Sequence, residues 1–136
     1  MAYLLDTNIV SELVTHPSGS VARRIGEIDE EAVATSIIVA GELRFGAVKR
    51  GAQRLVRRVE AVLAALAVLP LESPADAVYA ELRAALERHG QLIGANDLWI
   101  AAHAVALGRV LVTADAGFSR VSGLKTENWI ERTGGP

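Results

Sequence analysis

The sequence contains no cysteine, few aromatic residues and no large excess of either charge. The absence of cysteine from 136 residues excludes disulfide scaffolds, zinc fingers, iron–sulfur sites and thiol nucleophiles. A net charge of −2 excludes a polybasic nucleic-acid binder. Any anionic ligand must therefore be held by local charge or by a metal ion.

Long hydrophobic runs are also missing. The longest apolar run, residues 61–70, is shorter than the ~20 residues of a membrane span, and the N-terminus lacks the basic segment of a signal peptide. We therefore expect no membrane association, and the absence of cysteine fits a cytoplasmic protein. Hydrophobic residues still make up 51% of the chain, which is enough for a core, and the length predicts a single domain over residues 1–136.

Short apolar segments alternate with helical patterns along the chain. We predict strands at 2–5, 32–35, 67–71, 109–113 and 125–129. Helices are predicted at 9–14, 21–28, 37–49, 54–66, 75–89 and 96–107, with a helical turn at 116–121 and with Ser73 as a helix cap before Pro74. Several strands lack polar alternation, so both faces of the sheet should be covered. This pattern predicts a three-layer α/β domain with a mainly parallel central sheet flanked by helices.

The informative residues are four carboxylates in apolar surroundings. Asp6 and Asp115 each follow a predicted strand, and Asp97 begins a predicted helix. Taken singly, each of these aspartates is explained by helix capping. Glu42 is different, because it lies in mid-helix on the same face as Ile38 and its other apolar neighbours. An unpaired acid on a core face costs several kcal/mol.

The predicted topology brings these acids together. Ligands of open parallel sheets bind beyond the carboxyl ends of the strands, and all four acids fall near that edge. Four carboxylates would repel one another unless a cation neutralised them. With no cysteine and with three histidines that lack ligand spacing, an all-oxygen site favours Mg²⁺ or Mn²⁺ over Ca²⁺. Such sites suit phosphate substrates.

Four stretches of the chain together resemble the PIN-domain ribonucleases, and more narrowly the VapC-type toxins of type II (VapBC) toxin–antitoxin systems. They are YLLDTNIVSEL at 3–13, TSI to ELRFG at 35–46, IGANDLWIAAH at 93–103 and LVTADAGF at 111–118. Each short motif is weak alone, but the ordered set is specific and spans nearly the whole chain. The resemblance implies a PIN-like fold and an endoribonuclease dependent on Mg²⁺ or Mn²⁺.

The resemblance also implies roles for individual residues. The catalytic and metal-site acids would be Asp6, Glu42, Asp97 and Asp115, of which Asp115 is the most variable in the family. Polar side chains that orient the carboxylates or a water would be Thr7, Asn8 and Thr113. Capping and turn formation explain these last three equally well.

The family further implies partners. These are an RNA substrate, often transfer or ribosomal RNA, whose cleavage stops translation, a second copy in a homodimer, and a cognate VapB-type antitoxin. Arg44, Arg50 and Arg54 are candidate contacts to the RNA backbone. A solvated helix face explains Arg50 and Arg54 better, and a surface ion pair explains Arg44 equally well.

Two other functions stay open. A phosphatase or receiver-type domain would use Asp6 as phosphoacceptor, but the chain lacks the second acid of a DxD start. A catalytically inactive PIN fold would serve as an RNA- or protein-binding module, which the presence of all four acids disfavours. His103, Trp99 and Trp129 are further candidates for chemistry. We predict that the two tryptophans pack in the fold and that His103 is a packed or an exposed histidine without a catalytic role.

Overall fold

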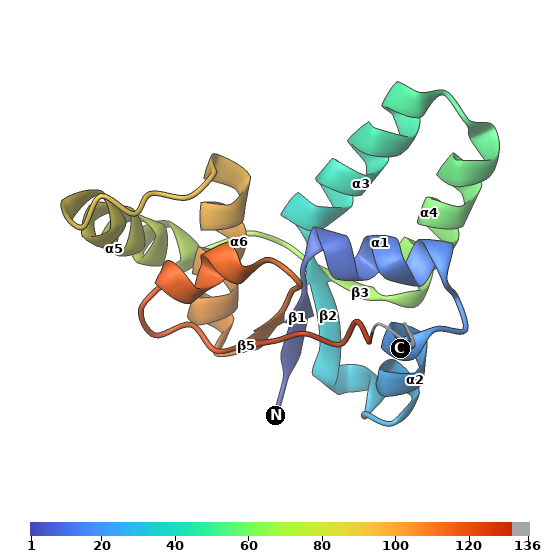
Figure 1. Ribbon diagram of the computed structural model, residues 1–136, viewed down its shortest axis with the longest axis horizontal. Helices are drawn as coiled ribbons and strands as arrows, with labels where there is room; N and C mark the ends of the chain where they lie inside the picture. The colour runs from blue at the N-terminus through green and yellow to red at the C-terminus, as the bar shows by residue number, and fades with distance from the viewer. Residues whose placement is uncertain (132–136) are drawn as a thin grey trace, which may run out of the picture.

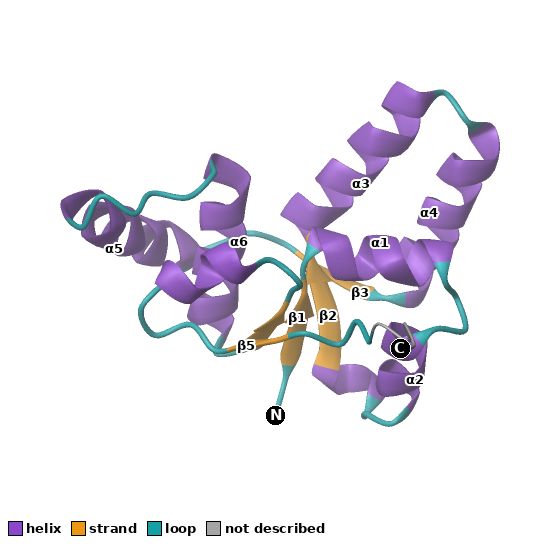
Figure 2. Ribbon diagram, in the orientation of Figure 1, coloured by secondary structure: helices purple, strands orange, loops and turns teal. Residues whose placement is uncertain are grey.

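Five short strands form one sheet in the order β3-β2-β1-β4-β5, with helices on both sides (Figures 1 and 2). The computed structural model describes residues 1–131, and the last five residues of the predicted domain, 132–136, lie outside the described residues. Two short 3₁₀ helices carry the label η. The elements are β1 (Tyr3–Leu5), α1 (Thr7–Thr15), α2 (Ser20–Gly26), η1 (Glu30–Ala32), β2 (Val33–Ser36), α3 (Ile37–Arg50), α4 (Gln53–Ala65), β3 (Ala67–Leu69), α5 (Ala75–Arg88), α6 (Ala95–Leu107), β4 (Val110–Val112), η2 (Ala116–Arg120) and β5 (Thr126–Glu127).

The strand pairing confirms the predicted three-layer α/β architecture and makes it entirely parallel. Each of the four strand pairs is parallel, with Leu5 opposite Thr35 of β2 on one side and Val112 of β4 on the other. The central strands β1, β2 and β4 are buried along their whole length. Burial on both faces explains why these strands are continuously apolar in the sequence.

The crossovers leave the sheet in opposite directions from its centre. The chain moves outward from β1 to β2 and β3, and it then returns across β1 to reach β4 and β5. Because parallel crossovers are right-handed, α1–α4 cover one face of the sheet, and α5 and α6 cover the other, as Figure 1 shows. The chain therefore leaves β1 and β4 toward opposite faces. This divergence opens a crevice at their carboxyl ends, where ligands bind in such sheets.

The core lies where the helices cover the central strands. Leu4, Leu111 and Phe118 are fully buried there, and Ile9, Val10 and Val14 of α1 belong to the same hydrophobic core. Trp129 packs edge-on against Tyr3 with ring centroids 5.0 Å apart, which confirms its predicted packing role. Among residues 1–131, no helix is both long enough and apolar enough to cross a bilayer.

Some predicted boundaries differ from the structure. Ser73 does not cap α5, so that prediction is wrong. Pro74 holds the cap position, because a turn closed by Ala75 N–H donating to the Glu72 carbonyl delays the start of the helix. Four of the strands are shorter than predicted, β2 is shifted by one residue to Val33–Ser36, and the predicted helix over 21–28 ends at Gly26.

Candidate active site

Asp6 lies at the carboxyl end of β1, on the floor of the crevice. Its backbone N–H donates to the Val112 carbonyl of β4 at 2.9 Å, which fixes the position of its Cα between the two central strands. The side chain is only 2% exposed. It accepts hydrogen bonds from the Thr7 N–H at 2.8 Å, the Thr113 hydroxyl at 2.7 Å and the Asn8 amide at 3.2 Å. Both carboxylate oxygens are therefore held in one orientation.

The same donors connect the ends of β1 and β4. Asn8 accepts from the Ala114 N–H at 3.0 Å, and the Thr113 hydroxyl accepts from the Asp115 N–H at 3.0 Å. Burial raises the pKa of Asp6, and the Thr113 and Thr7 hydrogen bonds partly offset that increase. The structure thus brings together the three polar residues that the resemblance singled out.

Glu42 faces this network from the neighbouring helix α3. The Thr7 hydroxyl donates to Glu42 Oε1 at 2.7 Å, across 35 residues of sequence. Thr7 therefore contacts Asp6 through its backbone and Glu42 through its side chain. The predicted location of Glu42 on a core face is wrong, because the residue is partly exposed and Phe45 on the next turn is 66% exposed. Figure 1 shows the reason: α3 extends past the edge of the sheet, so its outer turns have no strands beneath them.

Asp97 stands in the first turn of α6 and differs from the other acids. Its pKa rises to about 6, first because of burial and then because of the charges of Asp6, Asp115 and Glu42. No hydrogen bond contributes to this shift. Capping does not explain Asp97, because Gly94 holds the cap position of α6. Capping does describe Asp6 and Asp115, each of which accepts a backbone N–H at a helix start.

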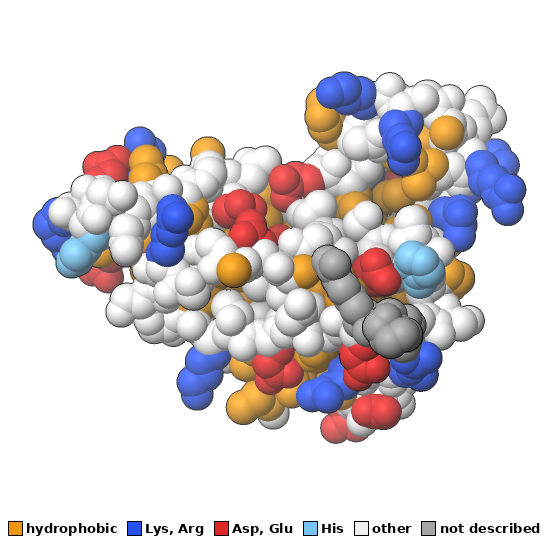
Figure 3. Space-filling model, viewed as in Figure 1, with side chains coloured by type: hydrophobic (Ala, Val, Ile, Leu, Met, Phe, Trp, Pro, Cys, Tyr) orange, Lys and Arg blue, Asp and Glu red, His pale blue; other side chains and the backbone are white. Residues whose placement is uncertain are grey.

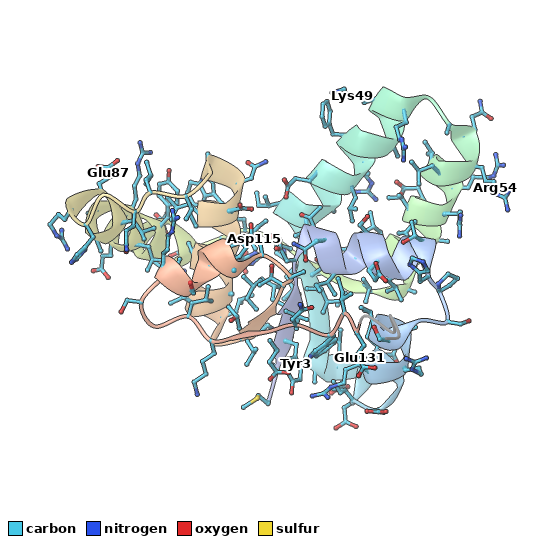
Figure 4. The ribbon with its side chains drawn as sticks, in the orientation of Figure 1. Tyr3, Lys49, Arg54, Glu87, Asp115 and Glu131 are labelled. Atoms are coloured by element: carbon cyan, nitrogen blue, oxygen red, sulfur yellow. The ribbon has the colours of Figure 1, made fainter. Side chains whose placement is uncertain are left out.

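Asp115 is exposed and caps η2, accepting the Gly117 N–H at 2.8 Å. Together with Asp97 it lines a pocket of about 310 Å³, which we call the acid pocket; Gly94, Gly117, Phe118 and Arg120 also line it. Figure 4 places Asp115 near the centre of the molecule, above the strand ends. Figure 3 shows acidic side chains gathered near the middle of the same face.

The donor chemistry of these acids suits a hard divalent cation, although they do not form a closed cage. Within residues 1–131, no three acidic or imidazole side chains are arranged to hold a metal ion together. The acids are instead close enough that the charges of Asp6, Asp115 and Glu42 add to the effect of burial in raising the pKa of Asp97. The Thr7 and Thr113 hydroxyls partly link the acids. Mg²⁺ commonly binds through one or two carboxylates and keeps several waters, so a closed cage is not required.

The three predicted RNA-contacting arginines have different surroundings. Arg44 forms a bidentate ion pair with Glu60 of α4, with both N–O distances at 2.9 Å. Arg50 lines a pocket of about 200 Å³ that Glu42 also borders. Arg54 lies at the outer end of α4, far from Asp115 in Figure 4. The structure therefore brings Arg50 near the acids and leaves Arg54 away from them.

Two aromatic residues of α6 pack in the fold, which confirms the prediction for Trp99 and shows that His103 is packed rather than exposed. His103 is 1% exposed, and its Nδ1 lies 2.9 Å from the hydroxyl of Ser36, the cap of α3. Trp99 stacks on Tyr79 of α5 with ring centroids 3.8 Å apart. Arg120, at the end of η2, borders the acid pocket but was not among the predicted site residues. No spacing rule in the sequence links it to the acids other than its position five residues after Asp115.

Comparison with known proteins places this fold and site in a family. The PIN domain family matches residues 3–124. The chain is 36% identical over 132 residues to Ribonuclease VapC2 of Haemophilus influenzae, covering 96% of this chain and 99% of that relative. It is 31% identical over 131 residues to the tRNA(fMet)-specific endonuclease VapC of Shigella flexneri, covering 95% of this chain and 98% of that relative.

A solved structure agrees with these matches. The crystal structure of VapBC2 from Rickettsia felis bound to a promoter DNA fragment contains a chain that superposes with a TM-score of 0.87 at 32% identity, covering 95% of this chain and 99% of that one. The fold is thus that of a PIN-domain protein. Within that class, the chain belongs to the VapC ribonucleases of VapBC toxin–antitoxin systems.

Proposed function

We propose that this ribonuclease cleaves RNA in the crevice between β1 and β4 and depends on Mg²⁺ or Mn²⁺ bound by its carboxylates. The observation that carries the proposal is the contrast between a rigidly held Asp6 and a nearby Asp97 whose ionisation is opposed by burial and by the charges of its neighbours. A divalent cation offsets the negative charges of the neighbouring carboxylates and so favours the ionised form of Asp97. A phosphodiester is an anion, so a cation between it and the acids also favours the approach of the substrate.

The acids have distinct roles in this proposal. Asp6 and Asp97 hold the cation directly, and Glu42 and Asp115 act on it directly or through waters. Thr113 and Asn8 keep the Asp6 carboxylate oriented, and such outer partners are needed for metal sites to work. The cation, when bound, lowers the pKa of a water and offsets charge on the phosphate.

We further propose a VapB-type antitoxin as the partner of this chain, because its relatives of known structure include VapBC complexes. Homodimer formation follows from the same family membership. The substrate proposed is structured RNA of the translation machinery, transfer RNA or ribosomal RNA, since the Shigella flexneri relative is a tRNA(fMet)-specific endonuclease. Cleavage of such RNA would inhibit translation, and it would take place in the cytoplasm, where that RNA functions.

The decisive experiment compares RNA cleavage by the wild-type protein with cleavage by Asp6→Asn and by Asp29→Asn. Asp29 is an exposed loop residue, so its substitution makes the same charge change away from the crevice. We expect cleavage that needs Mg²⁺ or Mn²⁺, is abolished by EDTA, and falls by more than about 100-fold in Asp6→Asn, beyond the usual effect of losing an outer partner. Asp29→Asn should cleave like the wild type.

Cleavage that persists in EDTA, or in Asp6→Asn, would contradict the metal dependence. An absence of cleavage with either ion on transfer and ribosomal RNA would favour the inactive binding module instead. The partner is tested separately by expression in bacteria. We expect growth arrest from the wild-type chain and relief on co-expression of an antitoxin encoded beside it, whereas Asp6→Asn should be harmless.

A further inference from the structure

Arg120 occupies a boundary between two pockets beside the acids. It ends η2, five residues after Asp115, and it lines the acid pocket together with Asp97. It also lines a neighbouring pocket of about 290 Å³, whose polar side chains include His89, Gln91 and Ser122. A chain of polar groups therefore continues from the acids past Arg120 into the second pocket.

Among residues 1–131, no acid forms an ion pair that would neutralise the charge of Arg120. Within the described part of the chain, the ion pairs of arginine involve Arg23, Arg24, Arg44 and Arg83, and none involves Arg120. Of the side chains that line the acid pocket, Arg120 alone carries a positive charge. It is exposed, so its guanidinium is accessible to a ligand.

The chemistry of this position suits a phosphate. A guanidinium donates two parallel hydrogen bonds to phosphate oxygens, and it keeps its charge at any working pH. A polynucleotide whose cleaved bond lies at the acids must pass its adjoining phosphates along the surface next to them. A strand that leaves Asp97 and Asp115 on one side passes Arg120, which is the positive side chain among the described residues that line the acid pocket.

We propose that Arg120 binds a phosphate next to the one that is cleaved and directs the RNA strand from the acid pocket into the second pocket. Arg120 is thus a substrate-binding residue that sets the register of the strand relative to the acids. This inference rests on the proposed ribonuclease activity, because it assigns the path of that substrate. His89, Gln91 and Ser122 offer hydrogen-bonding groups to the sugar or base that follows.

The test measures how binding depends on salt, which does not require cleavage. The probe is a short fluorescein-labelled single-stranded RNA, followed by anisotropy in EDTA over a range of salt concentrations. Each phosphate contact to single-stranded nucleic acid contributes about −0.7 to the slope of log K against log salt. We expect Arg120→Gln to lower the magnitude of that slope by about 0.7. Arg120→Lys should keep the wild-type slope.

Arg23→Gln is the matched control, since Arg23 is an exposed arginine on α2, beside the amino ends of the strands. Its slope should equal that of the wild type. If Arg120→Gln also keeps the wild-type slope, or if Arg23→Gln changes the slope equally, Arg120 does not bind phosphate and the inference is overturned.

A second measurement ties the contact to the position of the strand. In cleavage assays, Arg120→Gln should raise KM more than it lowers kcat for ordinary RNA. A substrate with one uncharged methylphosphonate linkage next to the cleaved bond should show no further loss in Arg120→Gln. An equal loss on both substrates would overturn the inference. If the wild type cleaves no RNA at all, the proposed function fails, and the salt slopes still decide whether Arg120 contacts phosphate.

Discussion

Asp6 and Asp97 are the same residue type in the same crevice, yet the fold treats them differently. Asp6 is almost fully buried and accepts three hydrogen bonds, two of which come from its own helix start and one from Thr113, the residue that follows β4. Asp97 is partly exposed, and burial and three neighbouring carboxylates raise its pKa to about 6. The carboxylate of Asp6 is preorganised. The carboxylate of Asp97 is repelled by its neighbours, and no hydrogen bond from the described residues offsets that repulsion.

The difference follows from where each residue stands in the topology. Asp6 lies where β1 and β4 diverge, so two strand ends supply donors to it. Asp97 projects from the first turn of α6, whose cap position is a glycine that offers no side chain. The ends of β1 and β4 supply donors that orient the Asp6 carboxylate. The start of α6 places the Asp97 carboxylate near Asp6 but supplies no donor to orient it. A bound cation would supply the positive charge that the surroundings of Asp97 lack.

The largest expected effect is the loss of RNA cleavage when Asp97 is substituted. We expect Asp97→Asn to lower RNA cleavage by more than about 100-fold, since losing a direct ligand should exceed the effect of losing an outer partner. The check is single-turnover cleavage at saturating Mg²⁺. Asp76→Asn is the control, because Asp76 is also a first-turn acid and lies on the exposed side of α5. Activity equal to wild type in Asp97→Asn would remove Asp97 from the site.

The next effect tests whether the orientation of Asp6 matters. Thr113→Val keeps the shape of the side chain but removes the hydroxyl that donates to Asp6 at 2.7 Å. We expect a 10- to 100-fold loss of cleavage at limiting Mn²⁺, about the effect of removing an outer partner. Thr126→Val, on the exposed edge strand β5, should leave cleavage unchanged. Normal activity in Thr113→Val would mean that Asp6 needs no such support.

Stability should respond in opposite ways at the two aspartates. In metal-free protein at pH 7.5, Asp97→Asn removes repulsion and should raise the free energy of unfolding by on the order of 1 kcal/mol, after discounting for the partial exposure of the group. Asp6→Asn should give no such gain, because an amide nitrogen would face the Asn8 and Thr113 donors. Thermal melts in EDTA measure both. Equal stabilisation by the two substitutions would contradict the proposed difference between the hydrogen-bonded Asp6 and the repelled Asp97.

The pH dependence of that gain has a definite sign. The folded-state pKa of Asp97, about 6, lies above its ordinary value of 3.8, so its contribution to stability is fully present below pH 3.8 and is lost as the pH rises through 6. The advantage of Asp97→Asn over wild type should therefore be greatest at pH 7.5 and shrink toward pH 4. Melts in EDTA across this range provide the check, and a constant difference would count against the raised pKa.

The smallest expected effect concerns the outer end of the α3–α4 pair. Arg54 lies far from Asp115 in Figure 4, and charges separated by more than a Debye length of ~10 Å are largely screened. We expect Arg54→Gln to change RNA cleavage by less than about threefold, in the range of weak surface electrostatics. KM measured at physiological salt tests this. A loss comparable to that of Arg120→Gln would place the RNA path over α4.

Sequence reasoning predicted the elements and their layers well, because local signals determine them. Ser36 caps α3, and Gly51 ends it with a left-handed φ of 67°, as a helix stop requires. The continuous apolar character of 109–113 predicted a buried strand, and β4 is a buried inner strand between β1 and β5.

Contacts between distant segments were harder to predict. Nothing local in the sequence shows that Thr7 donates to Glu42, 35 residues away, or that Thr113 donates to Asp6, 107 residues away. Helical periodicity also misplaced Glu42, because periodicity identifies a shared face but not whether anything covers it. The same limit hid Arg120, whose relation to Asp97 depends on how η2 and α6 approach each other.

The most direct test of the central claim is Mn²⁺ binding at pH 7.5, followed by calorimetry and by the shift in melting temperature. A ligand that binds only the folded protein stabilises it by an amount that grows with the logarithm of its affinity. We expect Mn²⁺ to bind and stabilise the wild type and Asp29→Asn, and to do so at least about tenfold more weakly in Asp6→Asn and Asp97→Asn. Equal Mn²⁺ affinity in all four proteins would contradict the claim that these carboxylates share one cation.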